Sequence, residues 1–462
     1  MLNIIMESDK STHRKALKIN LDDRYYGTFA EIGAGQEVAR WLFRVGGAAN
    51  KVAKSISAYD MGVSDAIYGK SSRYVSKDRL QAMLDKELEL DIERLSGKRG
   101  DTTAFFAFAD TVAAKSYKGN NECHGWMGIK FQASPRDTTS QITLHVRMLD
   151  SDPMLQQEAL GIIGINLIFG AFYLRNDTNE LIESLLDCLN PGRIEIDLIE
   201  FSGIEFRTVD NRAMALKLVQ LGLSGCAMFG PKGVLQPSEF FYKKSVIVER
   251  GSFRPPTLVN LDMMKCASEW FTRDNKETPT QVFELTMRNL TSQDKSVDLK
   301  DFIARAELLS TTGIPVMISD FQEYYKLAAY IGRQTKEKIG LVMGIPSLKE
   351  IFDEKYYSAL PGGILESFGR LFKNDLKLYV YPWKSGNETI TVDSLKVSTE
   401  LQMLYDYLRC RGSFFHLSNF NPQYLDIYSR EVLKMIQERD SNWENMVPES
   451  VAKMIKERNY FL

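Results

Sequence analysis

The second half of the chain repeats one pattern, in which a short apolar segment is followed by an amphipathic one. The apolar segments predict strands at residues 245–251, 281–287, 314–319, 338–344, 376–382 and 413–419. The segments between them carry apolar residues at helical spacing, at 258–271, 300–309, 321–332, 363–372 and 398–410. Such alternation favours a parallel sheet whose two faces are covered by helices. We therefore predict a Rossmann-like α/β domain over residues 240–462. In such a domain, ligands bind beyond the carboxyl ends of the strands, near the topological switch point.

The first half mixes the two periodicities without this regular alternation. Period-two patterns predict strands at residues 125–132, 141–149 and 193–201, and period-3.6 patterns predict helices at 36–58, 77–95 and 213–225. If the first two of these strands pair, His124, Lys130, His145 and Arg147 share one polar face. These residues could form an anion or metal pocket, but an ordinary exposed or interfacial sheet face is the favoured interpretation, because alternation always produces a polar side. We predict a mixed α+β domain of unknown function over residues 21–235.

The boundaries of the two domains follow from breaks in regular patterning. Residues 1–20 are polar and are predicted to be a flexible N-terminus. The segment 231–241 contains Pro231, Gly233 and Pro237, which interrupt helices and strands, and we place the domain boundary there. The chain has 462 residues, which is too long for a typical single hydrophobic core and agrees with two or more domains.

Composition restricts the classes of partner. The chain carries 58 Lys and Arg against 60 Asp and Glu, a balance that argues against a broad basic face, so we expect no nucleic-acid partner. The five cysteines are scattered, without a C-x-x-C pair. They predict reduced thiols in a cytoplasmic protein and no metal site. The sequence leaves open whether the protein forms a homo-oligomer.

One apolar stretch, residues 160–174, raises the question of a membrane span. It is shorter than the ~20 residues that a span requires, and it contains Asn166. We predict a buried helix instead, in which Gly161, Gly164 and Gly170 allow close packing, and we expect no membrane partner. The N-terminus shows no apolar segment with a small-residue cleavage site, so no secretory signal is predicted.

The first predicted strand of the second half ends in a glycine turn, in the sequence VIVERGSFRPPTLVN, residues 246–260. A glycine at Gly251 lets the backbone approach a phosphate, and the helix that follows presents free N–H groups to an anion. Thr257 is a plausible N-cap of that helix. The motif alone also fits a purely structural turn between a strand and a helix, and both interpretations stay open at this level.

The order of several motifs carries a resemblance to a known family. RGSFRPPTLVN resembles the strand–G-[ST]-F-[DN]-P-x-[TH]-x-x-H–helix signature of the nicotinamide or nicotinate mononucleotide adenylyltransferases, which belong to the HIGH superfamily of nucleotidyltransferases. Residues 342–357 and 426–461 resemble later motifs of that family. The resemblance covers about residues 240–462; the first half resembles no family to which we can assign a function. It implies ATP and Mg²⁺ as cofactors and a nucleotide or phosphorylated small molecule as partner. The residues that it implies for nucleotide binding are Gly251, Ser252, Phe253, Thr257, Gly344 and Ser429.

The sequence departs from this family at the positions that carry chemistry. Asn260 stands where the family has its signature histidine, and Arg254 stands where it has an acidic or amide residue. In the last motif Arg430 replaces a threonine, and Lys434 follows the position of a missing arginine. The resemblance thus implies Asn260, Arg254, Arg430 and Lys434 as the candidate catalytic residues. The segment Gly344–Ile345–Pro346 also lacks the family's carboxylate.

Two functions follow as hypotheses. In the first, the protein is a transferase of NAD biosynthesis, which moves AMP from ATP to a pyridine mononucleotide or a similar phosphorylated small molecule. In the second, the domain has lost the transferase chemistry and acts as a nucleotide sensor or assembly scaffold, with any activity in the N-terminal half. Loss of charge-stabilising groups commonly costs orders of magnitude in rate, which is why the second hypothesis is kept.

Overall fold

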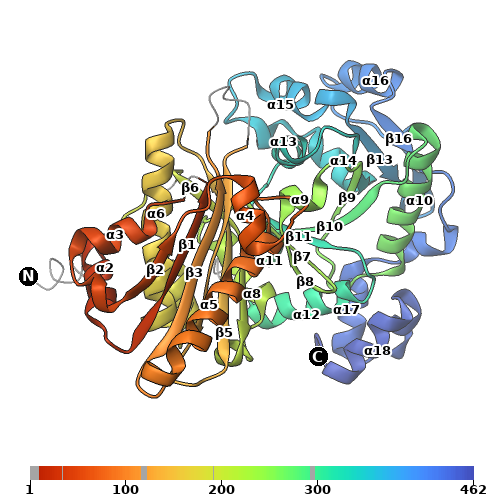
Figure 1. Cartoon of the computed structure of the whole chain (residues 1–462). Coiled ribbons are helices and arrows are strands. Elements are labelled where there is room, and N and C mark those ends of the chain that lie inside the picture. Colours follow the sequence, from red (N-terminus) through yellow and green to blue (C-terminus); the bar gives the residue numbers. More distant parts are fainter. Residues whose placement is uncertain (1–9, 34, 116–121, 191, 292–296) are drawn as a thin grey trace, which may run out of the picture. The chain divides into compact units, whose positions relative to one another are not determined.

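The computed structural model describes residues 10–33, 35–115, 122–190, 192–291 and 297–462 (Figure 1). The chain divides into two compact units, Met1–Ser224 and Gly225–Leu462, which we call the N-terminal unit and the C-terminal unit. The predicted boundary segment begins later, at residue 231. The difference arises because the residues around Pro231 and Gly233 form a hairpin turn that joins two strands of the C-terminal sheet.

The described part of the C-terminal unit contains an eight-stranded sheet in the order β16-β13-β12-β9-β10-β11-β7-β8. The strands from β16 to β11 are parallel, and β7 and β8 continue the sheet in antiparallel fashion. Their bounds are β7 Cys226–Gly230, β8 Gly233–Leu235, β9 Val246–Arg250, β10 Thr280–Thr286, β11 Val316–Ser319, β12 Ile339–Gly344, β13 Lys377–Tyr381 and β16 Phe414–His416. A separate hairpin pairs β14 (Trp383–Ser385) with β15 (Glu388–Ile390).

The strand order sets the position of the switch point. The chain runs from β9 to β10 and β11 in one direction, and then returns to place β12, β13 and β16 on the other side of β9. This is the Rossmann order, in which a crevice opens between the first and fourth parallel strands at their carboxyl ends. The predicted Rossmann-like α/β class is confirmed, and the switch point lies between β9 and β12.

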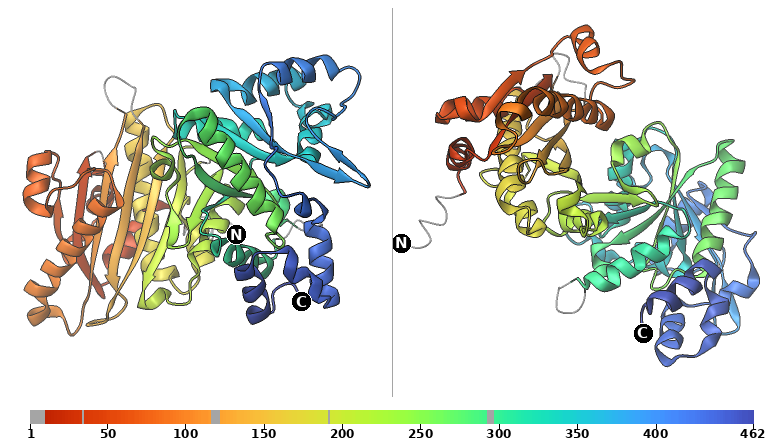
Figure 2. Two further views of the ribbon diagram at one scale, coloured as in Figure 1. Left: turned by 90° about the vertical axis from the view of Figure 1, so that its right-hand side faces the viewer. Right: turned by 60° about the horizontal axis from the view of Figure 1, so that its bottom comes forward.

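Helices cover both faces of this sheet (Figure 2). On one face, Val246 and Val248 of β9 belong to a core cluster with residues of α13, α15 and α16. On the other face, α10 packs against β9 and β12. The α-helices of the unit are α9 Pro237–Phe241, α10 Leu258–Asn275, α11 Met287–Leu290, α12 Leu299–Ser310, α13 Tyr324–Gln334, α14 Ile345–Ile351, α15 Gly363–Leu371, α16 Gln402–Cys410, α17 Ser429–Glu438 and α18 Glu449–Arg458. Short 3-10 helices span Glu354–Tyr357, Lys373–Asp375, Pro422–Asp426 and Ser441–Met446.

The described part of the N-terminal unit contains a six-stranded mixed sheet in the order β2-β1-β3-β4-β5-β6. Strand β1 is parallel to β2 and β3, and the remaining neighbours are antiparallel. Its strands are β1 Tyr25–Gly33, β2 Val52–Ile56, β3 Ala104–Ala113, β4 His124–Gln132, β5 Thr139–Met148 and β6 Ile194–Gly203. Its α-helices are α2 Thr12–Leu21, α3 Val38–Val45, α4 Met61–Tyr68, α5 Lys77–Arg99, α6 Pro153–Phe169, α7 Thr178–Ser184 and α8 Asn211–Gln220. Short 3-10 helices at Ala48–Asn50 and Ile204–Phe206 and a π-helical turn at Gly170–Leu174 complete it. The predicted mixed α+β class is confirmed.

The single helix predicted over residues 36–58 is wrong in its second half. Helix α3 ends at Val45, and Gly46 and Gly47 follow with φ of 81° and 79°. This left-handed backbone is favourable for glycine and stops the helix. Residues 52–56 then form β2, which gains a hydrogen-bonding partner in β1. Tertiary pairing therefore overrides the local helical spacing.

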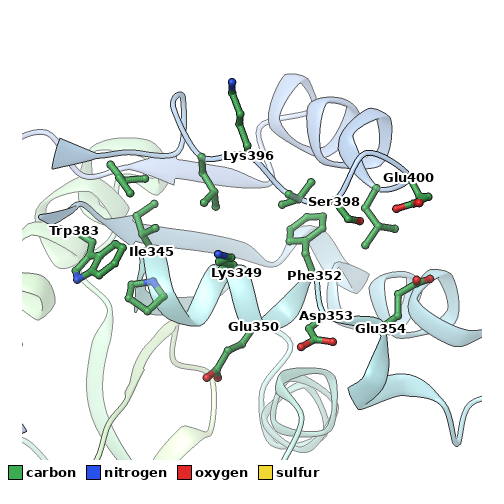
Figure 3. A pocket seen from close by; sticks show the side chains of 15 residues that line it. Ile345, Lys349, Glu350, Phe352, Asp353, Glu354, Trp383, Lys396, Ser398 and Glu400 are labelled. Atoms are coloured by element: carbon green, nitrogen blue, oxygen red, sulfur yellow. The ribbon is translucent and has the colours of Figure 1, made fainter. Parts of the chain in front are cut away.

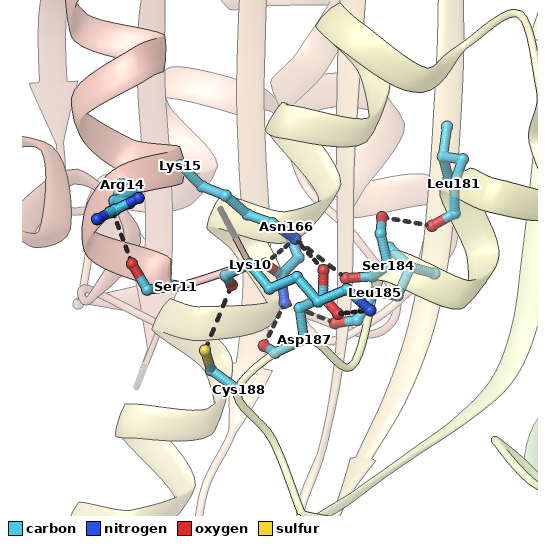
Figure 4. Close-up of polar contacts among 10 residues, drawn as sticks. All are labelled: Lys10, Ser11, Arg14, Lys15, Asn166, Leu181, Ser184, Leu185, Asp187 and Cys188. Atoms are coloured by element: carbon cyan, nitrogen blue, oxygen red, sulfur yellow. Dashed lines mark hydrogen bonds and ion pairs between the residues drawn. The ribbon is translucent and has the colours of Figure 1, made fainter. Parts of the chain in front are cut away.

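The prediction of a flexible N-terminus is also wrong for residues 12–20, which belong to helix α2. Ser11 caps α2 through a hydrogen bond from the Arg14 amide, and Ala16 and Ile19 are fully buried. Lys15 is also buried, and its ammonium group donates to Asn166 Oδ1 over 2.9 Å, to the Ser184 carbonyl and to Asp187 Oδ2 over 2.8 Å (Figure 4). Residues 1–9 lie outside the described residues.

The apolar stretch at 160–174 forms α6 and the π-helical turn, and the prediction of a buried helix is confirmed. By length and composition, Pro153–Leu174 is the one helix among the described residues that is apolar enough to cross a membrane, and 72% of its apolar window is buried. The predicted role of its glycines is also confirmed. A Cβ atom at Gly164 would lie 2.3 Å from Val38 Cγ2.

The predicted polar sheet face forms as expected, since β4 and β5 pair with His124 opposite Arg147. His124 Nδ1 lies 3.0 Å from His145 Nε2, and His145 Nδ1 lies 2.6 Å from Asp197 Oδ1. Lys130 pairs with Asp85 of α5 over 2.5 Å. Burial lowers the pKa of His124 to about 4, which keeps its ring neutral at neutral pH. These partners explain the face as an interior network of the N-terminal unit.

Candidate functional site

A cavity of about 470 Å³ lies at the switch point of the C-terminal sheet, beyond the carboxyl ends of β9, β12 and β13. Its walls come from the turn after β9, the first turn of α10, the segment after β13 and the residues that lead into α17. The lining residues are Ser252, Thr257, Val259, Asn260, Met263, Gly344, Pro346, Tyr381, Pro382, Trp383, Tyr424, Leu425, Ile427, Tyr428, Ser429 and Arg430. We call this the switch-point cavity.

The fold brings together residues of the predicted site that lie far apart in the sequence. Of the ten candidates, those that line the switch-point cavity are Ser252, Thr257, Asn260, Gly344, Ser429 and Arg430. A hydrogen bond from Ser429 Oγ to the Pro255 carbonyl, 3.1 Å long, ties the start of α17 to the turn after β9. All three segments that carry the family resemblance therefore contribute to the lining of one cavity.

The first turn of α10 is held by the side chain of Asn260. Its Oδ1 accepts hydrogen bonds from the backbone N–H and the hydroxyl of Thr257, each 2.9 Å long, in a reciprocal capping arrangement. Its Nδ2 donates to Glu249 Oε1 over 2.7 Å. Asn260 thus has a structural task at the position where the resembled family has its histidine. Thr257, predicted as the N-cap, takes that position.

Glu249 lies beneath this turn and is 1% exposed. Burial raises the pKa of its carboxyl group well above 4.5, and the hydrogen bond from Asn260 opposes this shift. Among the described residues, Oε2 has no hydrogen-bond partner. Burial therefore favours the protonated, uncharged form of this carboxyl group below the helix N-terminus.

Gly251 and Phe253, which the resemblance implies for phosphate binding, are absent from the cavity lining. A Cβ atom at Gly251 would lie 2.9 Å from Cζ of Phe253, so the glycine makes room for this ring. The ring is buried and lies 4.8 Å from that of Phe283. The Gly251 amide donates to the Glu284 carbonyl over 3.1 Å. In this structure both residues shape the turn, and Ser252 is the member of the turn that faces the cavity.

Two of the predicted cations also lie away from the cavity lining. Arg254 Nε is 2.6 Å from Asp301 Oδ1, and Asp301 also pairs with Arg305. Arg305 in turn donates to the Ser252 carbonyl over 3.1 Å. Lys434 is 71% exposed and lies 3.7 Å from Glu438 one helical turn further on. Arg254 therefore supports the turn, whereas Lys434 faces solvent on α17.

Arg430 is the remaining cation, and it is the one charged residue among the described residues that line the cavity. It is exposed, and no hydrogen bond or ion pair engages its guanidinium within the described part of the chain. It occupies the first turn of α17, where the backbone N–H groups lack intrahelical acceptors. The electrostatic character of the cavity is positive, because two helix N-termini and Arg430 meet there without a lining carboxylate.

Aromatic side chains form a wall that sequence reasoning missed. Tyr381, Trp383, Tyr424 and Tyr428 line the cavity. The Tyr381 hydroxyl donates to Asp262 Oδ2 and that of Tyr428 to the Lys384 carbonyl, both over 2.6 Å, so both rings are held in place. Residues that follow a strand of a parallel sheet are expected near its ligand. Tyr381–Pro382–Trp383 lie at the end of a predicted strand, and this position could have indicated that their aromatic rings border the site.

A second cavity of about 820 Å³ shares Pro346 and Trp383 with the switch-point cavity (Figure 3). Its lining comes from α14 and from the segment around residues 390–401. Lys349 and Lys396 contribute positive charge, and Asp353 and Glu354 are among its acidic residues. We call it the neighbouring cavity.

The donor set of the switch-point cavity does not fit a protein-held Mg²⁺. Magnesium sites in proteins are built from one or two carboxylates together with substrate phosphates. Here the side chains that carry oxygen are those of serine, threonine and tyrosine residues and the engaged amide of Asn260, without a lining carboxylate. Over the described ranges, no group of three or more His, Cys, Asp and Glu residues is placed to hold a metal ion.

Comparisons with known proteins assign no family. A scan against protein-family models finds no match, and no curated protein matches the chain. Solved structures of competence- and damage-related proteins match over about a third of it. CihA from Agrobacterium tumefaciens is 15% identical, with 34% of this chain and 94% of that chain covered and a TM-score of 0.26. A CinA superfamily protein from Klebsiella pneumoniae is 14% identical, with 35% and 98% covered and a TM-score of 0.27. With TM-scores this low, these similarities carry no argument about function.

Proposed function

We propose that the C-terminal unit binds a nucleotide in the switch-point cavity. One observation carries this proposal: the cavity combines two helix N-termini, an uncompensated arginine and an aromatic wall, without a lining carboxylate. Free N–H groups at helix N-termini bind phosphate, and an arginine forms charge-assisted hydrogen bonds with phosphate oxygens. Aromatic rings such as Trp383 stack on a base. A nucleotide supplies both an anionic group and a flat aromatic one.

The phosphates would lie between the first turns of α10 and α17. Ser252 supplies a hydroxyl donor there, and Arg430 supplies the compensating charge. Burial disfavours the charged form of Glu249 and so limits negative charge below α10. The base would lie toward Trp383 and Tyr424. This arrangement accounts for the absence of acidic residues from the lining, since a carboxylate would repel the ligand.

The resemblance of residues 240–462 extends the proposal to a reaction, the transfer of AMP from ATP to a phosphorylated small molecule such as a pyridine mononucleotide. A phosphate oxygen of the acceptor would attack the α-phosphorus of ATP, and the bond to the leaving pyrophosphate would break. The acceptor would lie in the neighbouring cavity, which shares Trp383 with the proposed nucleotide site. Arg430 would stabilise the charge that develops on the phosphates. Mg²⁺ would come with the nucleotide, and no step here depends on it.

A second candidate function, a nucleotide sensor or scaffold without transferase activity, is favoured by a specific observation. Asn260 and Arg254 are held by Glu249 and Asp301, respectively, so two of the four candidate catalytic residues already have structural partners. Arg430 alone is available in the cavity. Binding therefore has stronger support than transfer, and the two functions need separate measurements.

The experiment measures ATP binding by calorimetry and by thermal shift for the unchanged protein and two variants. Saturating ATP, at ~100 times its dissociation constant, should stabilise the protein by about 2.7 kcal/mol. Arg430→Ala should weaken binding by about 10- to 100-fold, since it removes a charge-assisted contact. Lys434→Ala is the matched control, because it removes a cation from the same helix outside the cavity and should leave binding unchanged.

Pyrophosphate release then separates the two functions. A transferase releases pyrophosphate from ATP when nicotinamide or nicotinate mononucleotide is added, and Arg430→Ala abolishes this release. A sensor binds ATP without release. If ATP does not bind, or if both variants bind it equally well, the proposed site is wrong.

A further inference from the structure

A second positively charged depression lies on the other face of the C-terminal sheet from α10, between α13 and α15. It has a volume of about 690 Å³, and its lining contains five cations and no carboxylate among the described residues. The cations are Lys326, Arg333, Lys336, Arg370 and Lys373. We call this depression the basic groove.

Two of these cations are neutralised by their own helices, and three are not. Lys326 pairs with Glu323 over 2.7 Å, and Arg370 pairs with Glu366 over 2.6 Å. Arg333, Lys336 and Lys373 are exposed and form no ion pair within the described part of the chain. The contact found for Lys336 is a weak one to the Gly332 carbonyl, 3.3 Å long. An excess of three positive charges therefore remains at one end of the groove.

These three cations come from two segments that are separate in the sequence. Arg333 lies in the last turn of α13, Lys336 lies two residues beyond that helix, and Lys373 follows α15. A cation near a helix C-terminus is stabilised by the helix dipole, which explains each residue singly. The dipole does not explain why all three border one depression with an apolar floor.

The floor of the groove is built from small and apolar side chains. Ala328, Ala329 and Gly332 leave open space above α13, since a Cβ atom at Gly332 would meet its first neighbour only at 3.9 Å. Phe321 and Leu376 border this space. A purely inorganic anion would leave the apolar floor unused, and an uncharged apolar molecule would leave the cations unused. The volume is in the range of small-molecule sites.

We propose that the basic groove is a second ligand site of the C-terminal unit, and that its ligand is an organic phosphate with an apolar or aromatic body. The phosphate binds Arg333, Lys336 and Lys373, and the body covers Ala328, Ala329 and Gly332. Charge complementarity selects the anion, and the floor selects for a body of matching size. The site stands on its own residues, so it does not depend on the switch-point cavity.

The experiment uses bis-ANS, a dianionic aromatic dye whose fluorescence rises in apolar sites, on the full-length chain carrying Arg430→Ala to remove the contribution of the switch-point cavity. In this background the double variant Arg333→Gln/Lys373→Gln should bind the dye at least about tenfold more weakly, because two charge-assisted contacts are lost. The matched control is Lys434→Gln/Lys453→Gln, which removes two exposed cations elsewhere and should leave the dye affinity unchanged. Equal weakening in both double variants overturns the proposal.

Displacement of the dye identifies the class of ligand. ADP offers an aromatic body, dioctanoyl phosphatidate offers an aliphatic one, and inorganic pyrophosphate offers none. Displacement of the dye by ADP or by the phosphatidate, at concentrations where pyrophosphate does not displace it, supports the proposal. The stronger of the two competitors then shows whether the groove prefers an aromatic or an aliphatic body. Displacement by pyrophosphate alone, or by none of the three, overturns it.

Discussion

Asn260 donates a hydrogen bond of 2.7 Å from its amide to Glu249, a fully buried carboxyl group on the neighbouring strand. The other end of the same amide accepts from Thr257 and so holds the first turn of α10. The residue that replaces the signature histidine of the resembled family is thus part of the scaffold of the switch-point cavity. The shape of the proposed phosphate site therefore depends on a buried carboxyl group.

Asn260→Ala should lower the free energy of unfolding by about 1–3 kcal/mol, because it leaves the Thr257 amide and the Glu249 carboxyl without their partner. Urea denaturation measures this loss. Asn442→Ala, which truncates an exposed amide, should stay within about 0.5 kcal/mol of the unchanged protein. A loss of similar size in both variants would argue against a scaffold role of Asn260.

Glu249→Gln should make stability less sensitive to a rise in pH above 4.5. The folded state raises the pKa of Glu249 above 4.5, so the folded state binds more protons than the unfolded one, and stability falls as pH rises above 4.5 toward the raised pKa. Glutamine keeps the acceptor for Asn260 and cannot ionise. Urea denaturation at pH 5 and pH 9 should show a smaller decrease for the variant. Identical decreases would show that Glu249 does not titrate in this range.

A second buried carboxyl group predicts a pH effect in the N-terminal unit. Glu31 lies opposite Asp110 in the register of β1 and β3, and burial raises the pKa of Glu31 to about 7. Stability should therefore fall between about pH 4.5 and pH 7, by a few kcal/mol at most, since one pKa unit corresponds to about 1.4 kcal/mol.

Glu31→Gln tests this effect, because it removes the titration and keeps an acceptor oxygen for one of the two amides, those of Val38 and Ala39, that donate to the carboxylate. The stability of the variant relative to the unchanged protein should rise between pH 4.5 and pH 8. Exposed Glu93→Gln is the control and should show no such trend. A gain that is independent of pH would contradict the assignment.

Lys15→Ala should destabilise the N-terminal unit by about 3–5 kcal/mol, because it leaves Asp187 and Asn166 without their buried cation. Lys18→Ala, one turn away on the exposed side of α2, should cost about 1 kcal/mol or less, since it loses only its contact with the rings of Phe169 and Tyr173. Chemical denaturation followed by circular dichroism compares the two. Equal losses would mean that α2 is not anchored through Lys15.

Gly164→Ala should destabilise the protein by about 1–3 kcal/mol, since the added methyl group would overlap Val38 of α3. Gly97→Ala should change stability in the opposite direction. That glycine lies in α5 with open space around its missing Cβ, so alanine should raise stability by up to about 1 kcal/mol. Thermal denaturation of both variants measures the difference in sign, and two changes of the same sign would contradict the packing of α6 on α3.

Much of the fold was predictable, because strong periodicity reflects burial directly. The strands of the C-terminal sheet and the burial of α6 appear in the sequence as apolar patterns, and they occur in the structure. The helix predicted over 36–58 failed because local spacing cannot show that residues 52–56 find a strand partner in β1. Residues 12–20 look polar, yet α2 is ordered because Lys15 meets three acceptors that lie more than 150 residues away.

The candidate site shows the same division at the level of side chains. The sequence by itself determined the alternation of strands and helices, and with it a parallel sheet with a ligand-binding edge, because these depend on local periodicity. It also indicated that Ser252, Asn260 and Arg430 belong to segments that resemble motifs of the adenylyltransferase family. Only the tertiary structure decided which side chains are available. Arg430 faces the cavity, whereas Asn260 and Arg254 are engaged by Glu249 and Asp301, since such pairings form between segments that the chain brings together only on folding.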